Sequence, residues 1–223
     1  MNGYLSTRGR ATALTVLAIL QIVALGSAVI AWAVGAAALD HDMAAAAPAF
    51  TVAAVVGGLD FLLFMAATIV FFTWVYRAMA NLAPLGSMST RFSPAMAVWA
   101  YIIPFVNLVW GHTVMAVIWR ESQPPTVTPE GVYTRSKTTL VNWWWGLYLA
   151  GSIIAMTAMF AHPVTVEDLT EFATKQILFE LLRVVTLILF VLMIRGAQKR
   201  QDEQWRDLEG QRNVPKPTAE ALR

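Results

Sequence analysis

The 223-residue sequence contains no cysteine and is poor in charged residues. Without a thiol, these residues form no disulfide, no thiolate metal site, no iron–sulfur cluster and no cysteine nucleophile. Charged residues make up 13% of the chain, about half of the roughly 25% that soluble domains carry. Much of the usual solvating surface is therefore missing, and the protein is predicted to lie in a membrane.

Histidine and recognisable catalytic motifs are equally scarce. The sequence has three histidines, His41, His112 and His162, and only His112 lies within an apolar segment. Membrane haem usually needs paired axial ligands, which a single intramembrane histidine does not supply. The motifs Gly-x-Ser-x-Gly and His-Glu-x-x-His and the phosphate-binding Walker loop are absent. We therefore expect no catalytic residue, no cofactor and no metal, and we expect the protein not to be an enzyme.

What the chain has instead is long apolar runs. Its residues are 57% hydrophobic, with a mean hydropathy of +0.57. Several runs exceed the roughly 18 apolar residues that a bilayer-spanning helix needs. They predict an all-α integral membrane protein, with one transmembrane bundle at residues 1–200 and a polar cytoplasmic tail at residues 201–223. Spans are expected at about residues 11–39, 49–76, 141–160 and 172–194, with a further apolar segment at about residues 93–119.

The distribution of Lys and Arg indicates which segments cross, because cytoplasmic connections are enriched in both. Fourteen cations lie at the N-terminus, in the two connections beside residues 93–119 and after the last span, against Lys175 alone in the other connections. This split results if residues 93–119 enter and leave on one face. If all five segments span, the cations divide ten to five.

The charge count therefore predicts four transmembrane helices plus a re-entrant or interfacial helical hairpin, with both termini in the cytoplasm. Five transmembrane helices are the alternative. Cations at membrane edges also account for the pI of about 9.1 without a nucleic-acid partner.

The midpoint of residues 93–119 supports the hairpin. Pro104 removes a backbone donor and clashes with the preceding turn, which favours a break in the helix. Asn107 is expected to satisfy the backbone groups freed by that break, because hydrocarbon cannot. His112 follows in the second half of the hairpin. An ordinary transmembrane helix kinked at Pro104 is the simpler alternative, since such prolines are common in spans.

Several short motifs lie in and around this segment. They are Trp74-Val75-Tyr76-Arg77-Ala78-Met79-Ala80-Asn81, Arg91-Phe92-Ser93-Pro94, Ile103-Pro104-Phe105-Val106-Asn107-Leu108, Trp119-Arg120 and Trp143-Trp144. Together, over about residues 72–148, they resemble the bacterial multi-pass membrane family known as domain of unknown function 4328. The sequence departs from the family pattern at Gly111-His112, where the family is associated with a further proline. The resemblance implies a membrane architecture and supplies no activity.

Three charged residues lie inside predicted spans. Asp60 is about a third of the way along the second span, and Glu180 and Arg183 lie one turn apart in the last. Charges at such depth are costly and by default mark functional sites with partners. Asp60 and Arg183 fall at similar depth and so can pair between helices, and Glu180 can pair with Arg183 along one face. A buried ion network that fixes helix register is the leading interpretation. An ion or proton pathway and pairing with a partner helix are the alternatives.

Aromatic side chains gather toward the cytoplasmic ends of the predicted spans. Three consecutive tryptophans fan over about 200° of a helix, so they do not line one pocket wall. An interfacial belt is the preferred interpretation, and a hydrophobic ligand or quinone site is the alternative. The predicted belt consists of Trp74, Tyr76, Arg77, Trp119, Trp143, Trp144 and Trp145.

These patterns lead to an expectation about function. The protein is predicted to be a non-catalytic bacterial inner-membrane protein, an accessory or scaffold subunit that binds another membrane protein, a second copy or lipid. Small residues on a helix face, Ser27, Ala31 and Gly35, support helix association. The alternative is permeation of a small solute or ion through a polar path near the re-entrant hairpin. An intramembrane enzyme is the third alternative.

Overall fold

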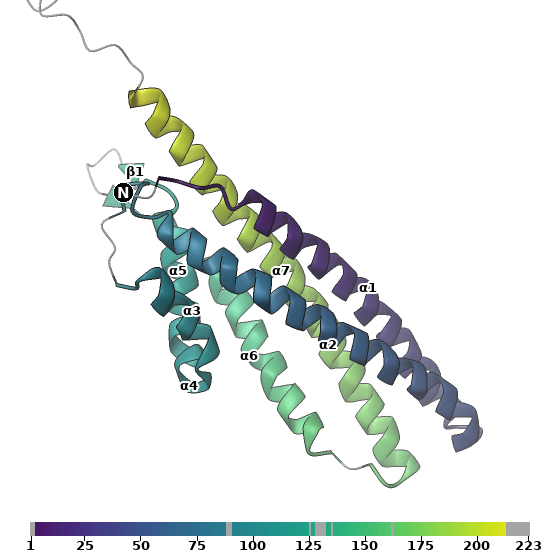
Figure 1. Ribbon diagram of the computed structural model, residues 1–223. Coiled ribbons are helices and arrows are strands. Elements are labelled where there is room, and N and C mark those ends of the chain that lie inside the picture. Colours follow the sequence, from purple (N-terminus) through teal and green to yellow (C-terminus); the bar gives the residue numbers. More distant parts are fainter. Residues whose placement is uncertain are drawn as a thin grey trace, which may run out of the picture.

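The computed structural model describes residues 3–87, 91–124, 126–127, 133–134, 136–161 and 163–212 (Figure 1). This part of the chain forms an all-α fold with one π-helical turn and one pair of two-residue antiparallel strands. The elements are α1 (Arg8–Ala38), α2 (Met43–Ala80), α3 (Pro94–Ile102), α4 (Pro104–Val106), η1 (Asn107–Gly111), α5 (His112–Glu121), β1 (Thr126–Val127), β2 (Tyr133–Thr134), α6 (Thr139–Met159) and α7 (Val166–Arg212).

The long helices extend beyond the predicted spans. α2 begins at Met43 because the Asp42 carboxylate accepts a hydrogen bond from the Ala44 amide at 2.6 Å and a run of alanines follows. α7 continues without a break from Val166 to Arg212. Residue 200, the predicted boundary between bundle and tail, therefore lies inside this helix. Residues 213–223 of the predicted tail lie outside the described residues.

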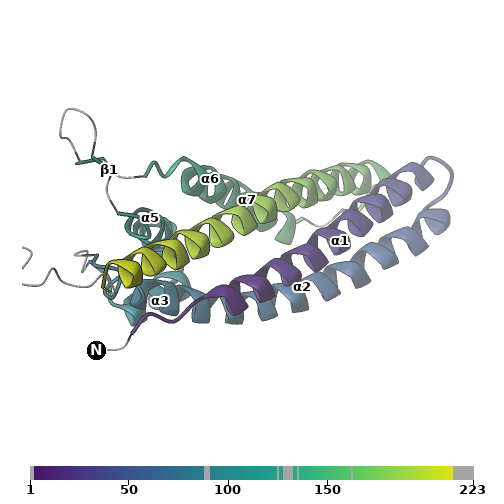
Figure 2. The same cartoon turned by 90° about the horizontal axis from the view of Figure 1, so that it is seen from above.

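Helix α1 lies between two other long helices. It packs along both α2 and α7, and α6 packs on α7. Figures 1 and 2 show α1, α2 and α7 running side by side. In Figure 2, α7 lies between α6 and the pair formed by α1 and α2. The opposite side of α2 is covered by α3 only near its C-terminal end, so much of its length faces outward.

Helices α1, α2 and α7 are each long and apolar enough to cross a membrane. The pair formed by α3 and the helical run Pro104–Glu121 passes the same test but bends by 104° at its break. The described residues thus hold three candidate spanning helices, or four if the bent pair is one span. α6, which corresponds to the span predicted at residues 141–160, has 21 residues and is not among these candidate spanning helices. The number and length of these apolar helices indicate a membrane protein.

The segment predicted to form a hairpin consists of short helical arms. Ser93 caps α3 by accepting a hydrogen bond from the Met96 amide at 3.2 Å, and Pro94 takes the first helical position. Ile103 is extended, with φ −84° and ψ 116°, because Pro104 disfavours helical backbone in the residue before it. The chain then turns through α4 and η1 into α5, and α4 lies at the tip in Figure 1.

The core lies at the end of the bundle where α2, α5 and α7 meet. Its largest fully buried side chains include Trp74, Met115, Ile118, Met193 and Ile194. α5 and α7 pack tightly at Gly196, where a Cβ would lie 2.8 Å from the ring of Trp119. Only glycine allows this contact, because a methyl group there would displace the indole. The core therefore holds the second arm of the bent segment against the last helix.

Candidate functional site

The three charged residues of the predicted spans come together between α2 and α7. Arg183 Nη1 lies 2.7 Å from Asp60 Oδ2 and 3.5 Å from Glu180 Oε2. Gln21 of α1 donates through Nε2 to Asp60 Oδ1 at 3.3 Å. Asp60 is 5% exposed and Glu180 is 8% exposed. We call these four residues the intramembrane cluster.

The intramembrane cluster joins α1, α2 and α7 through side chains distant in sequence. Both carboxylates share one guanidinium, which also lies 5.5 Å from the ring centroid of Phe179. Buried ion pairs are favourable only in a narrow geometry, so these contacts constrain the register of α2 against α7. Sequence reasoning missed Gln21. The available signal was that it is the one amide side chain within residues 11–39.

The polar groups of the hairpin are arranged differently from the prediction. Asn107 Oδ1 is buried and has no hydrogen-bond partner among the described residues, so it does not satisfy the freed backbone as expected. The Tyr101 hydroxyl donates to the Gly111 carbonyl at 2.7 Å across the turn and so links the two arms of the hairpin. The π-helical turn explains the difference, since it directs the Asn107 side chain at Gly111 within the same turn.

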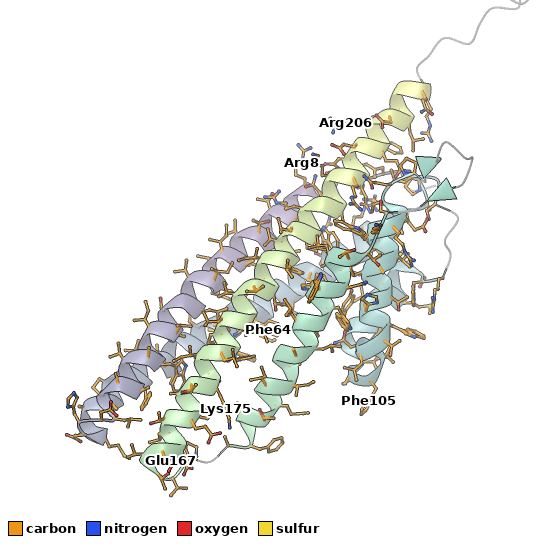
Figure 3. The ribbon with its side chains drawn as sticks, turned by 180° about the vertical axis from the view of Figure 1, so that it is seen from behind. Arg8, Phe64, Phe105, Glu167, Lys175 and Arg206 are labelled. Carbon is orange, nitrogen blue, oxygen red and sulfur yellow. The ribbon has the colours of Figure 1, made fainter. Side chains whose placement is uncertain are left out.

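The other two predicted hairpin residues lie apart from each other. His112 Nε2 and Asn142 Oδ1 are 2.8 Å apart, which connects α5 to α6. Pro104 is exposed at the break, and its neighbour Phe105 is 85% exposed at the tip (Figure 3). Within the described ranges, no hydrogen bond or ion pair links these residues to the intramembrane cluster. The two sets of predicted site residues therefore form separate sites.

Four of the six aromatic residues predicted to form an interfacial belt are buried instead. Trp74, Trp119, Trp144 and Trp145 are between 0% and 7% exposed and belong to the core. Tyr76 and Trp143, at 50% and 65% exposure, face outward. The fan of consecutive tryptophans on α6 explains this split, because α5 and α7 cover two of the three rings. The belt prediction is therefore wrong for the four buried tryptophans.

Trp119 has a structural role that its sequence position did not reveal. Its Nε1 donates to the Lys137 carbonyl at 3.0 Å, which holds the chain leading into α6. The Arg200 guanidinium lies 3.6 Å from the indole centroid and donates to the Trp119 carbonyl at 3.2 Å. Trp119 therefore connects α5, the following loop and α7.

A polar network that sequence reasoning missed holds the N-terminal segment against α7. The Asp202 carboxylate accepts hydrogen bonds from the Tyr4 hydroxyl, the Ser6 hydroxyl at 3.0 Å, Arg8 Nη2 at 3.2 Å and Gln198 Nε2 at 2.5 Å. Burial by itself raises the pKa of Asp202, but these donors together lower it below its ordinary value. Burial, with the hydrogen bond to Asp202, raises the pKa of the Tyr4 hydroxyl, which therefore keeps its proton as a donor.

Gln201 extends this network to the ends of α2 and α5. Its Nε2 donates to the Ala78 carbonyl at 3.0 Å and to Ser122 Oγ at 3.1 Å, and its Oε1 accepts from Asn81 Nδ2 at 3.2 Å. Gln201 is 1% exposed. The first residues of the predicted tail are therefore part of the packed bundle. The sequence signal for this packing was the spacing of Gln198, Gln201 and Asp202, which places three polar side chains on one helix face.

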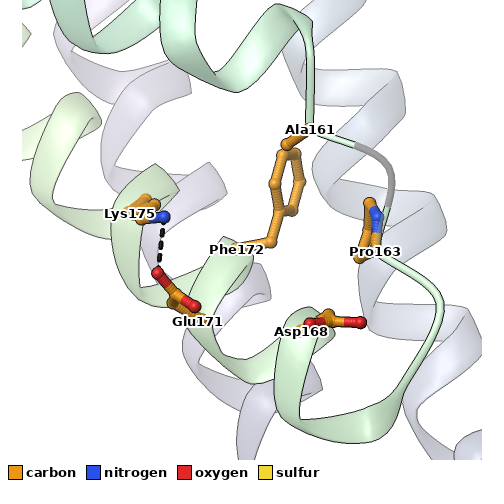
Figure 4. Close-up of a pocket in the computed structure, with 6 residues that line it drawn as sticks. All are labelled: Ala161, Pro163, Asp168, Glu171, Phe172 and Lys175. Carbon is orange, nitrogen blue, oxygen red and sulfur yellow. Dashed lines mark ion pairs between the residues drawn. The ribbon is translucent and has the colours of Figure 1, made fainter.

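A hollow of about 220 Å³ lies at the turn between α6 and α7, and Figure 4 shows its lining residues, Ala161, Pro163, Asp168, Glu171, Phe172 and Lys175. Lys175 Nζ pairs with Glu171 Oε1 at 2.5 Å, and both side chains are well exposed. Hydrogen bonds from Thr165 and Val164 lower the pKa of Asp168, which forms a capping box with Thr165 at the start of α7. In the part of the chain that the structure describes, no three His, Asp or Glu side chains are grouped to hold a metal ion.

A larger hollow lies beside the C-terminal part of α2, next to the N-terminal segment and the first turn of α1. Its volume is about 510 Å³, and it is lined by Leu5, Arg10, Phe72, Thr73, Tyr76 and Arg77. We call it the N-terminal groove. Arg77, predicted as part of the interfacial belt, donates from Nη2 to the Gly3 carbonyl at 2.9 Å. This contact fixes the N-terminal segment along one edge of the groove.

Comparison with known proteins finds one family. The family described as "Domain of unknown function (DUF4328)" matches residues 36–199, which include α2, the bent segment, α6 and most of α7. The intramembrane cluster lies within the matched region except for Gln21. No curated protein and no solved structure matches the chain.

Proposed function

Since the chain belongs to the family described as domain of unknown function (DUF4328), whose description names no activity, we propose a function from the arrangement of the bundle itself. The protein acts as a non-catalytic accessory or scaffold subunit of the bacterial inner membrane. It presents the outward face of α2 to a helix of another membrane protein. The observation that carries this proposal is an exposed glycine in the middle of that face.

The outward face of α2 has small side chains where a second helix would cross. Ala54 and Gly58, one turn apart, are both exposed, and a Cβ at Gly58 would meet nothing within 4 Å. The neighbouring Gly57 is equally open. By contrast, Gly35 and Gly196 each face an aromatic ring of the same chain at close range. Contacts within the described chain thus explain why Gly35 and Gly196 are glycines. They do not explain Gly57 and Gly58.

Association with another helix would explain the exposed glycines Gly57 and Gly58. A glycine inside a helix costs about 1 kcal/mol relative to alanine, so two in succession need a compensating gain. Small residues four apart allow two helix backbones to approach closely in a membrane, where van der Waals contact drives association. Phe61, Leu62 and Ile69, at 59%, 65% and 66% exposure, supply large apolar side chains around such a crossing.

The proposal includes a topology with four spans, α1, α2, α6 and α7, and both termini in the cytoplasm. The segment from α3 to α5 is then a re-entrant or interfacial hairpin. The bend of 104° supports this, as does a 3.0 Å hydrogen bond between Ser87 Oγ and Glu121 Oε2 that joins the two flanks of the hairpin. Arg8 and Arg206 lie at the same end of the bundle, and Glu167 lies at the other (Figure 3).

Single cysteines test this topology without background labelling, because the chain has none of its own. His41→Cys and Lys137→Cys would be treated in intact cells with a membrane-impermeant thiol reagent. We expect labelling at position 41 only. Labelling at position 137 from outside would show that the bent segment spans, and would refute the hairpin.

Gly58→Leu tests the scaffold role. The substitution adds volume to the crossing point without touching the rest of the described chain, so folding should be preserved while the partner is lost. Gly26→Leu is the matched control, because Gly26 is an exposed glycine on α1 whose Cβ would also meet nothing within 4 Å. We expect the wild type and Gly26→Leu to co-purify with the same partner in mild detergent. A wild-type protein without any partner, or a Gly58→Leu variant that retains it, contradicts the proposal.

Met65→Cys identifies the kind of partner. Met65 lies two turns after Gly58 on the outward face of α2 and is 38% exposed. Oxidation in membranes should produce a disulfide dimer if the partner is a second copy. A cross-link to another protein by a bifunctional thiol reagent, without the dimer, identifies a hetero-complex.

Permeation of a small solute or ion near the hairpin is the second candidate. It is favoured by the buried Asn107 Oδ1, an acceptor without a hydrogen-bond partner among the described residues, located at a helix break. Broken helices supply such groups to solutes in many transporters. Purified protein in liposomes would then show flux, and Asn107→Leu would abolish it without changing the unfolding temperature. Absence of flux in the wild type removes this candidate.

A further inference from the structure

The N-terminal groove combines a cationic edge with an apolar floor. Arg10 comes from the first turn of α1 and Arg77 from the last turn of α2, and no acidic residue lines the groove. Phe72 and Leu5 supply apolar surface beside them. This groove is distinct from the outward face around Gly58, because it lies some 14 to 19 residues further along α2.

The two arginines are not neutralised within the described chain. Arg10 is exposed and forms no hydrogen bond or ion pair with any described residue. Arg77 uses Nη2 for the Gly3 carbonyl, but its Nε is buried without a hydrogen-bond partner. Asp202, which holds the N-terminal segment, accepts its arginine hydrogen bond from Arg8. The groove therefore keeps two positive charges and one unsatisfied donor.

Tyr76 places the groove at the level where lipid headgroups lie. It is 50% exposed, and it stands in the last turn of α2, between the apolar stretch and the polar turn at Asn81. Exposed tyrosines at such positions lie at the membrane–water interface, with the ring toward hydrocarbon and the hydroxyl toward water. Leu5, which lines the same groove, is 60% exposed. A soluble anion would leave this apolar surface uncovered.

We propose that the N-terminal groove binds one anionic phospholipid. Its phosphate lies between the guanidinium groups of Arg10 and Arg77, and its acyl chains lie along Phe72 and Leu5. Arginine suits this role because its planar fork donates two hydrogen bonds to phosphate oxygens. The phosphate neutralises the two guanidinium groups, and the acyl chains cover the apolar floor in the same binding event.

Native mass spectrometry of the purified full-length protein tests the proposal. The probe is a mixed micelle with equal amounts of phosphatidylglycerol and phosphatidylcholine, and the readout is the fraction of protein that retains each lipid. The wild type should retain one phosphatidylglycerol in preference to phosphatidylcholine. Arg10→Gln should lower its retention about five-fold, since each cation near an anionic lipid contributes about that factor. Arg77→Gln should lower its retention by a similar factor, because it removes the second guanidinium of the groove.

Lys199→Gln is the matched control. Lys199 is a well-exposed cation beyond the apolar part of α7 and does not line the groove. Its removal changes the net charge of the protein by the same amount and should leave retention unchanged. If Lys199→Gln lowers retention as much as Arg10→Gln, the lipid is held by general charge attraction and the proposed site is refuted.

Three further outcomes would overturn the proposal. Equal retention of both lipids by the wild type would show that the arginines do not select a headgroup. Displacement of phosphatidylglycerol by millimolar glycerol phosphate would show a soluble-anion site in place of a lipid site. If Arg77→Gln unfolds because the Gly3 contact is lost, Arg10→Gln with an unchanged melting temperature carries the test alone. A result of normal retention in that variant also refutes the proposal.

Discussion

Replacing Arg183 with methionine should destabilise the bundle much more than replacing Asp60 with asparagine. Arg183 is the single cation of the intramembrane cluster, and it lies 2.7 Å from Asp60 and 3.5 Å from Glu180. Methionine preserves much of the length of the side chain and removes the charge. Both buried carboxylates then lose their counter-ion. Asparagine at position 60 instead leaves Arg183 paired with Glu180, and it can still bond to Gln21.

The expected magnitudes follow from this asymmetry. Removing one partner of a buried ion pair costs about 3–5 kcal/mol, because the remaining charge is unpaired in a medium of low dielectric constant. The Arg183 side chain is 23% exposed and the Asp60 side chain 7%, so water screens the pair only slightly. Arg183→Met should therefore fall in that range. Asp60→Asn replaces a charged hydrogen bond with a neutral one, a difference of about 1 kcal/mol.

Unfolding by sodium dodecyl sulfate in mixed micelles, followed by tryptophan fluorescence, measures both free energies. The double variant completes a double-mutant cycle. With Asp60 already neutral, Arg183→Met leaves one unpaired carboxylate and should lower the free energy of unfolding by less than it does in the wild type. Equal losses for the two single variants would refute the reasoning. So would an Arg183→Met variant as stable as the wild type, which would show that the cluster does not stabilise the helix packing.

Three other predictions follow from particular contacts. Gly196→Ala should lower the free energy of unfolding by about 1–3 kcal/mol, because the new methyl group would lie 2.8 Å from Trp119, and thermal melting in detergent measures the loss. The lowered pKa of Asp202 stabilises the folded state above about pH 4, and this stability is lost as pH falls through the folded-state pKa. Hydrogen-exchange protection factors, which correct for the intrinsic pH dependence of exchange, should therefore fall in acid around Asp202 in α7, and Asp202→Asn should remove that change. Trp144→Ala should cost about 3–5 kcal/mol and Trp143→Ala less than about 1 kcal/mol, because the first is buried and the second is 65% exposed. Equal losses at these two positions would contradict the burial pattern of α6.

The bent segment shows how far local chemistry predicts structure. Pro104 breaks the helix at the predicted position. It disfavours helical backbone in the residue before it, and Ile103 is extended. The role given to Asn107 was wrong, because the π-helical turn directs that side chain at Gly111, and the Tyr101 hydroxyl bonds to the Gly111 carbonyl from across the turn. A proline acts on its immediate neighbours. The hydrogen-bond partner of a backbone carbonyl in the second arm, by contrast, depends on how that arm packs against the first.

The tryptophans of α6 make the same point for the site. Their spacing predicted that they would point in different directions, but it did not say which would be buried. Trp144 lies against Phe190 of α7, and Trp145 lies against His112 of α5. The packing of these two helices therefore determines which rings are buried in the bundle. Trp143 faces outward, at 65% exposure, because no helix among the described residues covers that side.

The sequence by itself determined that the protein is an all-α membrane protein, where its helix breaks, and which charges lie inside its long apolar helices. Each of these depends on hydropathy, proline geometry or residue type, which are local properties. Only the tertiary structure decided that Gln21 joins Asp60 and Arg183, and that Asp202 binds the N-terminal segment. Those contacts join residues 39 to 198 positions apart, so they exist only once helix packing has set the distances between them.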